Sequence, residues 1–247
     1  MVNEVIRQIM AHRSIRKFDY NFEIPRDHID LIIKAGQRAS TSSMLQMYTI
    51  IEIPKAERQS EVTICGSQQF IKDASYFGII FTDFYRLKRL TEVSEGTYDE
   101  NYPSLELTMG ILDAGLIAQN MALASESLGY GMVYCGACGD FGDQIIEKLE
   151  IPEKVLPLTG IAIGKRIESP KLSPRLPSSL IHHIGKYKQY SDNELQQGIQ
   201  IINEGLSEKA GTTVNWADIL KARYEGSWAP IRNGKRKKII LQQFGTD

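Results

Sequence analysis

The chain has few of the features that mark secreted, membrane or nucleic-acid-binding proteins. Its 247 residues include only three cysteines, and 29 basic side chains against 30 acidic ones leave a formal net charge of −1. A charge this close to neutral gives no indication of nucleic acid or an anionic membrane as a partner. The N-terminus, MVNEVIRQIMAHRS, is too polar for the apolar region of a secretory signal. We therefore expect reduced thiols and a cytoplasmic protein.

Cysteine and histidine are also too scarce to predict a zinc site. Cys135 and Cys138 form a C-x-x-C motif, which leaves a redox or metal site open. Cys65 and the four histidines form no second closely spaced pair of ligands, so we expect no metal.

No long uninterrupted apolar run is present. The longest helical pattern, Leu105 to Leu128, carries Glu106, Asp113 and further polar residues. Polar groups at this density argue against a transmembrane span. The small residues of this segment predict instead a helix at the centre of the fold or at a subunit interface.

The familiar catalytic motifs are absent as well. The sequence has no G-x-S-x-G, H-E-x-x-H or P-loop motif and no obvious acid/base dyad. No G-x-G-x-x-G turn follows the first predicted strand, which disfavours a Rossmann dinucleotide site. An enzyme without such groups leaves the chemistry to a cofactor, which the protein binds and orients.

The most informative feature that is present is the pentapeptide from His12 to Arg16, HRSIR. Two arginines that flank a hydroxyl can contact different parts of one ligand. One can bind a phosphate, and the other can place a positive charge against a second part of the same ligand. Arg175 lies between Pro174 and Pro177, on a stiff segment that can add a third cation. Ordinary surface ion pairs are the alternative for any one of these arginines.

The spacing of apolar residues, together with the capping and helix-breaking residues, predicts alternating helices and strands. Helices are expected at residues 3–11, 25–36, 55–64, 105–128, 141–149, 192–208 and 216–222, and strands at 47–53, 76–82, 132–135 and 156–163. Gly129 is the expected left-handed end of the long helix. By pattern alone, this alternation favours a parallel α/β sheet.

Six sequence segments, taken in their order along the chain, argue against a parallel sheet. They are HRSIR (12–16), RASTSSMLQ (38–46), CGSQQFI (65–71), GYGMVYCGA (129–137), LPLTGIAIG (156–164) and SPRLP (173–177). From about residue 3 to about residue 190 the chain resembles the flavin-dependent nitroreductase superfamily, and most closely its NADPH-dependent FMN reductases and oxygen-insensitive major nitroreductases. The resemblance implies an α+β fold with a mixed, mainly antiparallel sheet flanked by helices, in an intertwined homodimer. It also implies one FMN-binding domain over 1–247, in which 165–247 is an extended C-terminal arm with a helical excursion.

The same resemblance implies the site and its reaction. An FMN-dependent NAD(P)H oxidoreductase would pass hydride from NADPH or NADH to the flavin, and then electrons to nitroaromatics, quinones or free flavin by a ping-pong mechanism. A flavin carrier or redox sensor without efficient turnover is the alternative. No side chain is expected to be catalytic, because the flavin carries the chemistry. The implied FMN-binding residues are His12, Arg13, Ser14, Ser173 and Arg175 at the phosphate; Arg16 near N1, where it tunes the flavin; Gln68 at the pyrimidine edge; the backbone of Cys135, Gly136 and Ala137 near N5; and Thr41, Ser42, Ser43 and Gln46 from the second subunit.

Two departures from the family pattern bear on the ligands. Ser173 stands where the family often has lysine, and Lys171 is the neighbouring cation that can compensate. The stretch from Leu206 to Asn215 holds one cation, Lys209, where NADPH-preferring members have several arginines. The basic run from Gly234 to Lys238 is interpreted as a solvated C-terminal segment, with a role near an anionic ligand as the alternative.

Overall fold

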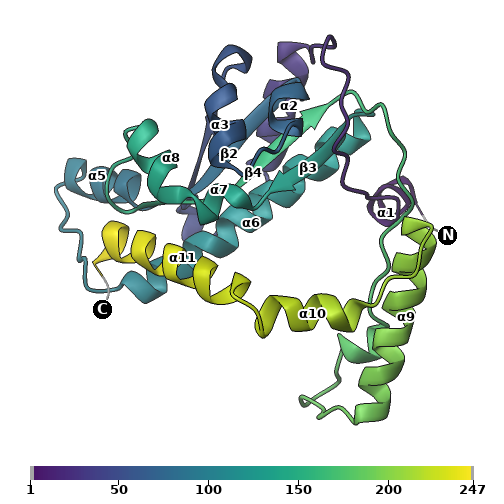
Figure 1. The fold of residues 1–247 in the computed structure, drawn as a ribbon. Coiled ribbons are helices and arrows are strands. Elements are labelled where there is room, and N and C mark those ends of the chain that lie inside the picture. Colours follow the sequence, from purple (N-terminus) through teal and green to yellow (C-terminus); the bar gives the residue numbers. More distant parts are fainter. Residues whose placement is uncertain (1–2, 246–247) are drawn as a thin grey trace. The chain divides into compact units, whose positions relative to one another are not determined.

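The computed structural model describes residues 3–245 and contains a four-stranded sheet with helices on both faces (Figure 1). The strands are β1 (Tyr48–Glu52), β2 (Tyr76–Asp83), β3 (Gly131–Cys135) and β4 (Val155–Gly164). The helices are α1 (Glu4–Met10), α2 (Arg26–Gly36), α3 (Gln59–Ile64), α4 (Phe70–Asp73), α5 (Tyr85–Val93), α6 (Pro103–Ser127), α7 (Ala137–Asp140), α8 (Gly142–Lys148), α9 (Asp192–Ala210), α10 (Trp216–Tyr224) and α11 (Trp228–Phe244). Short 3-10 turns lie at η1 (Ser42–Met44), η2 (Lys55–Glu57) and η3 (Ser178–Leu180).

The strand order is β1-β2-β4-β3, and each neighbouring pair is antiparallel. A parallel bridge between Ser14 and Met132 adds the N-terminal segment beside β3. The prediction of an α+β fold with a mainly antiparallel sheet is confirmed. The prediction of a parallel sheet from the helix–strand pattern alone is wrong. Helix–strand alternation along the chain does not determine strand direction, because the antiparallel pairs here join strands that are distant in sequence.

Strand β2 shows how the sheet divides the core. Its side chains alternate between the two faces, as in any strand. Phe77 and Ile79 pack with α3, α4, α7 and α8 on one face, whereas Tyr76 and Ile80 pack with α2 and α6 on the other. Because both faces are covered, all of β2 is buried.

Helix α6 is long and apolar enough, by length and composition, to be a candidate membrane span. In this fold it packs on α2 and the sheet through small residues. A Cβ on Gly110 would lie 2.7 Å from a ring carbon of Phe84, so the close approach requires glycine there. Its ionisable residues Glu106 and Asp113 are buried and hydrogen-bonded. These contacts are those of a core helix, as the small residues predict.

Most predicted elements are present, with boundaries shifted by a few residues. Gly129 has a φ of +86°, which confirms the expected left-handed end of the long helix. Four helices, α4, α5, α7 and α11, were missed. The basic run from Gly234 to Lys238 lies inside α11 and is largely exposed, as expected of a solvated C-terminal segment.

The chain divides into two compact units, residues 1–169 with 233–247 and residues 170–232. The first contains the sheet, α1 to α8 and most of α11. The second contains the SPRLP segment, α9 and α10. In it, Ser191 and Glu194 form a reciprocal capping box at the start of α9.

Candidate functional site

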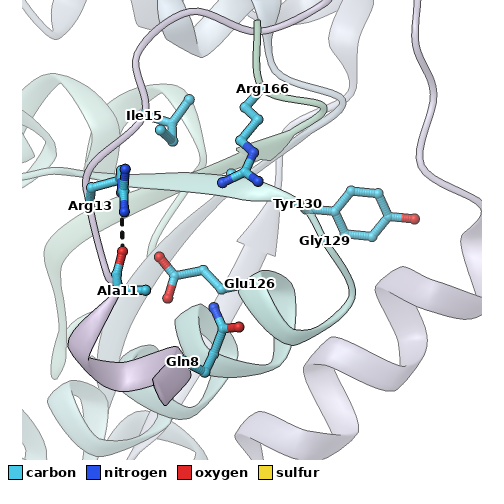
Figure 2. Close-up of a pocket in the computed structure, with 9 residues that line it drawn as sticks. Gln8, Ala11, Arg13, Ile15, Glu126, Gly129, Tyr130 and Arg166 are labelled. Carbon is cyan, nitrogen blue, oxygen red and sulfur yellow. Dashed lines mark hydrogen bonds between the residues drawn. The ribbon is translucent and has the colours of Figure 1, made fainter. Parts of the chain in front are cut away.

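A small pocket of about 250 Å³ lies in the first unit beside the HRSIR segment (Figure 2). Side chains of Arg13, Arg166 and Glu126 point toward it in Figure 2. Two guanidinium groups over so small a space favour an anionic group of an incoming ligand. The lining residues are Gln8, Ala11, Arg13, Ile15, Glu126, Gly129, Tyr130, Gly131 and Arg166.

Strand β3 holds the HRSIR segment in place. The backbone N–H of Ile15 donates to the carbonyl of Met132 at 2.9 Å, and the Ile15 side chain is buried. A Cβ on Gly131 would lie 2.8 Å from Ile15, so only glycine permits this close contact. Arg13 is thereby fixed at the pocket, where its Nε donates to the carbonyl of Ala11 at 3.1 Å.

His12, a predicted phosphate ligand, is engaged by a carboxylate. Its Nδ1 lies 2.7 Å from Oε1 of Glu126, near the end of α6. His12 and Ser14 are both half-buried, but neither lines the pocket. The structure therefore assigns Arg13 to the pocket and gives His12 an internal partner.

Arg16 is exposed, and its backbone is anchored by Glu168. Oε1 of Glu168 accepts hydrogen bonds from the backbone N–H groups of Arg16 at 2.5 Å and Lys17 at 3.0 Å. One carboxylate oxygen thus holds two consecutive residues of an extended segment. This leaves the Arg16 guanidinium to project from a fixed backbone.

The loop with the predicted hydroxyl cluster is fastened to α6. The Thr41 hydroxyl donates to Oδ2 of the buried Asp113 at 2.5 Å and accepts from the backbone N–H of Gln46 at 2.8 Å. Ser43 and Gln46 have φ values of 49° and 51°, in the left-handed region that is uncommon for residues other than glycine. The hydrogen-bonding capacity of Thr41 is used within the loop, whereas Ser43 and Gln46 are exposed and Ser42 is half-buried.

The residues predicted at the flavin ring lie on two neighbouring segments. Gln68 is half-buried between α3 and α4, after Gly66 and Ser67 with φ values of 73° and 61°. Gly136, at the end of β3, is exposed, and a Cβ there would meet open space. The two segments meet through Cys65 and Cys138, whose Sγ atoms are 3.5 Å apart.

In the second unit the SPRLP segment has its own contacts. Arg175 is exposed, and its Nη1 donates to the carbonyls of Ser173 at 3.2 Å and Pro174 at 3.0 Å. The cation that reaches Ser173 is Lys209, whose Nζ lies 2.6 Å from the serine hydroxyl. Lys171 is instead bonded to Glu208. Lys209, rather than Lys171, is therefore the cation in contact with Ser173.

Sequence reasoning missed five residues that shape these sites. Arg166 and Tyr130 line the pocket, and Glu126, Glu168 and Asp113 hold its predicted residues or those of the hydroxyl loop. Arg166 and Glu168 come soon after the predicted strand at 156–163, and charged residues at the end of a strand are a sequence feature that could have marked them as site residues. The other three lie in or next to the long helix, where nothing local distinguishes them from core residues.

Comparison with known proteins shows the family of this chain. The sequence profile of the nitroreductase family matches residues 9–165. The chain belongs to the nitroreductase family. An FMN reductase (NADPH) of Bacillus subtilis (strain 168) is 34% identical over 194 residues, which cover 78% of each chain. An NADPH-dependent oxidoreductase of Staphylococcus saprophyticus is 36% identical over 218 residues, 87% of this chain and 86% of that one.

Solved structures show the same family fold. B. megaterium NfrA2 superposes with a TM-score of 0.90 at 28% identity, over 98% of both chains. The nitroreductase-like fold predicted from the six motifs is therefore confirmed.

Proposed function

We propose that this nitroreductase-family chain binds FMN and acts as an NAD(P)H-dependent oxidoreductase. It takes electrons from NADPH or NADH and delivers them to nitroaromatics, quinones or free flavin by a ping-pong mechanism. The proposal is supported by family membership, by the relatives named FMN reductase (NADPH) and NADPH-dependent oxidoreductase, and by the geometry of β3.

Strand β3 is the observation that carries the proposal. One end, at Gly131 and Met132, holds the HRSIR segment and the cationic pocket. The other end, at Cys135, leads directly into the exposed Gly136. Four rises of about 3.3 Å separate these ends by about 13 Å, which is of the order of an extended FMN molecule from phosphate to ring. Phosphate-binding and ring-binding features thus stand at the two ends of one strand.

Arg13 and Arg166 are the cations for the phosphate. A guanidinium binds phosphate oxygens through two parallel N–H donors, which fixes orientation as well as charge. Ser14 and His12 are adjacent donors. The roles of Ser173 and Arg175, in the second unit, rest on the sequence resemblance, and Lys209 supplies positive charge beside Ser173.

Bound FMN would supply the redox chemistry, accepting a hydride from nicotinamide and giving two electrons to an acceptor. Arg16 provides the cation near N1, and Glu168 fixes its backbone. Gln68 provides an amide for the pyrimidine edge. The exposed backbone at Gly136 leaves room for a ring to approach the N–H groups of the 135–137 segment.

The active form is a homodimer in which the partner's loop at 41–46 completes the site. Helix α6 exposes an apolar face that includes Leu105, Ile111, Leu112 and Leu116, between 37% and 61% exposed. Burial of such a face against a second copy is favourable at about 25 cal/mol per Å². Ser43 and Gln46 are the exposed polar residues of this loop. A cytoplasmic location remains a prediction from the reduced thiols.

One experiment tests the function. The purified protein is expected to show flavin absorbance, to release FMN rather than FAD on denaturation, and to be bleached anaerobically by NADPH or NADH. Bound flavin that neither donor reduces would support the carrier or sensor alternative. A protein that binds no flavin would refute both.

A further inference from the structure

All three cysteines of the chain meet at one point. The Sγ atoms of Cys65, Cys135 and Cys138 lie within 4.8 Å of one another, and each residue is buried. Cysteines used only as small apolar residues would have no reason to gather, because alanine or valine fill such space equally well. Convergence of every cysteine in 247 residues indicates a site.

The cluster is built by two separate parts of the fold. Cys135 ends β3 and Cys138 lies in α7, so the C-x-x-C motif supplies two thiols from one tight turn. Cys65 ends α3 and supplies the third, at 3.5 Å from Cys138. The partner that the C-x-x-C motif lacked in sequence is thus provided by tertiary structure.

The distances suit one central ion better than a disulfide. Metal–thiolate bonds of about 2.3 Å place sulfurs around one ion roughly 3.8 to 4.0 Å apart. The sulfurs here are 3.5 Å apart in one pair and at most 4.8 Å apart in any pair, so shifts of a few tenths of an ångström suffice. A disulfide bond of about 2.05 Å would require Cys65 and Cys138 to approach by about 1.5 Å.

The thiols are close enough to interact directly. The Sγ atoms of Cys65 and Cys138 are in hydrogen-bond contact at 3.5 Å, and either atom can be the donor. Because only thiolates bind a metal ion, binding of an ion at this cluster must release protons.

We propose that Cys65, Cys135 and Cys138 form a three-thiolate binding site for a soft, thiophilic d10 cation such as Cu(I). Among the described residues no histidine or carboxylate joins the cluster. Structural zinc sites use four protein ligands, whereas thiolate groups select Cu(I) among the softer ions. The backbone of Cys135 also belongs to the proposed FMN site, but the thiol site uses its side chain, and the test uses no flavin reaction.

Cd²⁺ is a redox-inert probe of this site. The reduced, full-length protein is dialysed anaerobically against Cd²⁺, and bound metal, released protons and the thiolate-to-cadmium absorption band are measured. One ion per chain with release of protons is the expected result, because thiols must deprotonate to bind. No retained cadmium, or retention without the thiolate band, overturns the proposal.

Protection of the thiols identifies the ligands in the unmodified protein. Bound Cd²⁺ should slow alkylation of all three cysteines together. Tryptic peptides separate Cys65 from the other two, because Lys72 and Arg89 lie between them. Protection of Cys135 and Cys138 without Cys65 would overturn the three-thiolate site.

Variants supply an independent check. Cys65→Ser should lower Cd²⁺ affinity at least about tenfold, since it removes one of three soft ligands. The control His182→Ala removes an exposed imidazole from the second unit and should leave affinity unchanged. The proposal is contradicted if Cys65→Ser binds Cd²⁺ as tightly as the parent protein, or if His182→Ala binds it more weakly. If Cys65→Ser does not fold, the protection experiment decides.

Discussion

The buried carboxylate of Asp113 accepts the hydroxyl of Thr41 at 2.5 Å, which ties the loop before β1 to the middle of α6. The same Oδ2 accepts the backbone N–H of Met47 at 3.1 Å. One carboxylate oxygen therefore fixes both ends of a loop that contains residues in left-handed conformation. This loop is the one proposed to complete the partner's flavin site, so Asp113 positions it without touching the ligand.

Asp113→Ala should destabilise the protein and weaken FMN binding. It leaves the Met47 N–H without its buried acceptor, at a cost of about 1 to 3 kcal/mol. Urea unfolding should show a lower midpoint. Asp99→Ala, at an exposed position in the segment before α6, is the control and should leave the midpoint unchanged. An unaltered midpoint in Asp113→Ala would show that the loop does not depend on this carboxylate.

Arg13→Ala, Arg166→Ala and Arg175→Ala should each weaken FMN binding by about 1.5 to 3 kcal/mol, the range for a hydrogen bond to a charged group. Fluorescence titration of the apoprotein with FMN measures the loss. Arg89→Ala removes an exposed cation of α5 that is paired with Glu92, and it should have no effect. If Arg13→Ala and Arg166→Ala bind FMN as tightly as the parent protein, the pocket does not bind the phosphate. If Arg175→Ala does so, the role of Arg175 implied by the resemblance is wrong.

Arg16→Leu should lower the reduction potential of the bound flavin and slow hydride transfer. It removes the cation that faces the negative charge developing at N1. A potentiometric titration compares this variant with Lys17→Leu, which removes the neighbouring exposed charge. Equal midpoints for Arg16→Leu and the parent protein would exclude this role.

Leu112→Glu should separate the proposed dimer and release FMN, because it places a charge in the exposed apolar face of α6. The control Val93→Glu changes an exposed residue at the end of α5. Sedimentation velocity with flavin detection follows both mass and loading. A flavin-loaded monomer of the parent protein at micromolar concentration would contradict the shared site.

Discrimination between NADPH and NADH should be weaker than in relatives with several arginines at the position of Leu206 to Asn215. The one lysine there, Lys209, contacts Ser173. In the basic run, Arg236 pairs with Asp140 and Lys238 lies 3.9 Å from Asp143. We expect a ratio of kcat/KM values below about a thousandfold that narrows at high salt, since the selectivity depends on a few charge contacts. A larger ratio would place the 2′-phosphate site elsewhere.

Local pattern was sufficient for much of the fold. The continuous apolar run at β2 predicted a strand buried on both faces, and the small residues of α6 predicted close helix packing. Helix α5 was missed although Leu87 and Leu90 recur at helical spacing, because the segment is short and none of its residues is fully buried. Six segments in the family's order identified the family, and one of them, HRSIR, makes close contact with β3 through Ile15 and Gly131.

The sequence by itself thus determined most of the elements and the family. Tertiary structure alone decided the antiparallel strand order, the partner of Thr41 in Asp113, the cation beside Ser173, and the meeting of Cys65 with Cys135 and Cys138. The physical reason is the distance along the sequence over which each kind of interaction acts. Burial and periodicity are recorded in neighbouring residues, whereas a hydrogen bond or a thiol cluster between distant residues depends on how the whole core packs, and no local pattern records it.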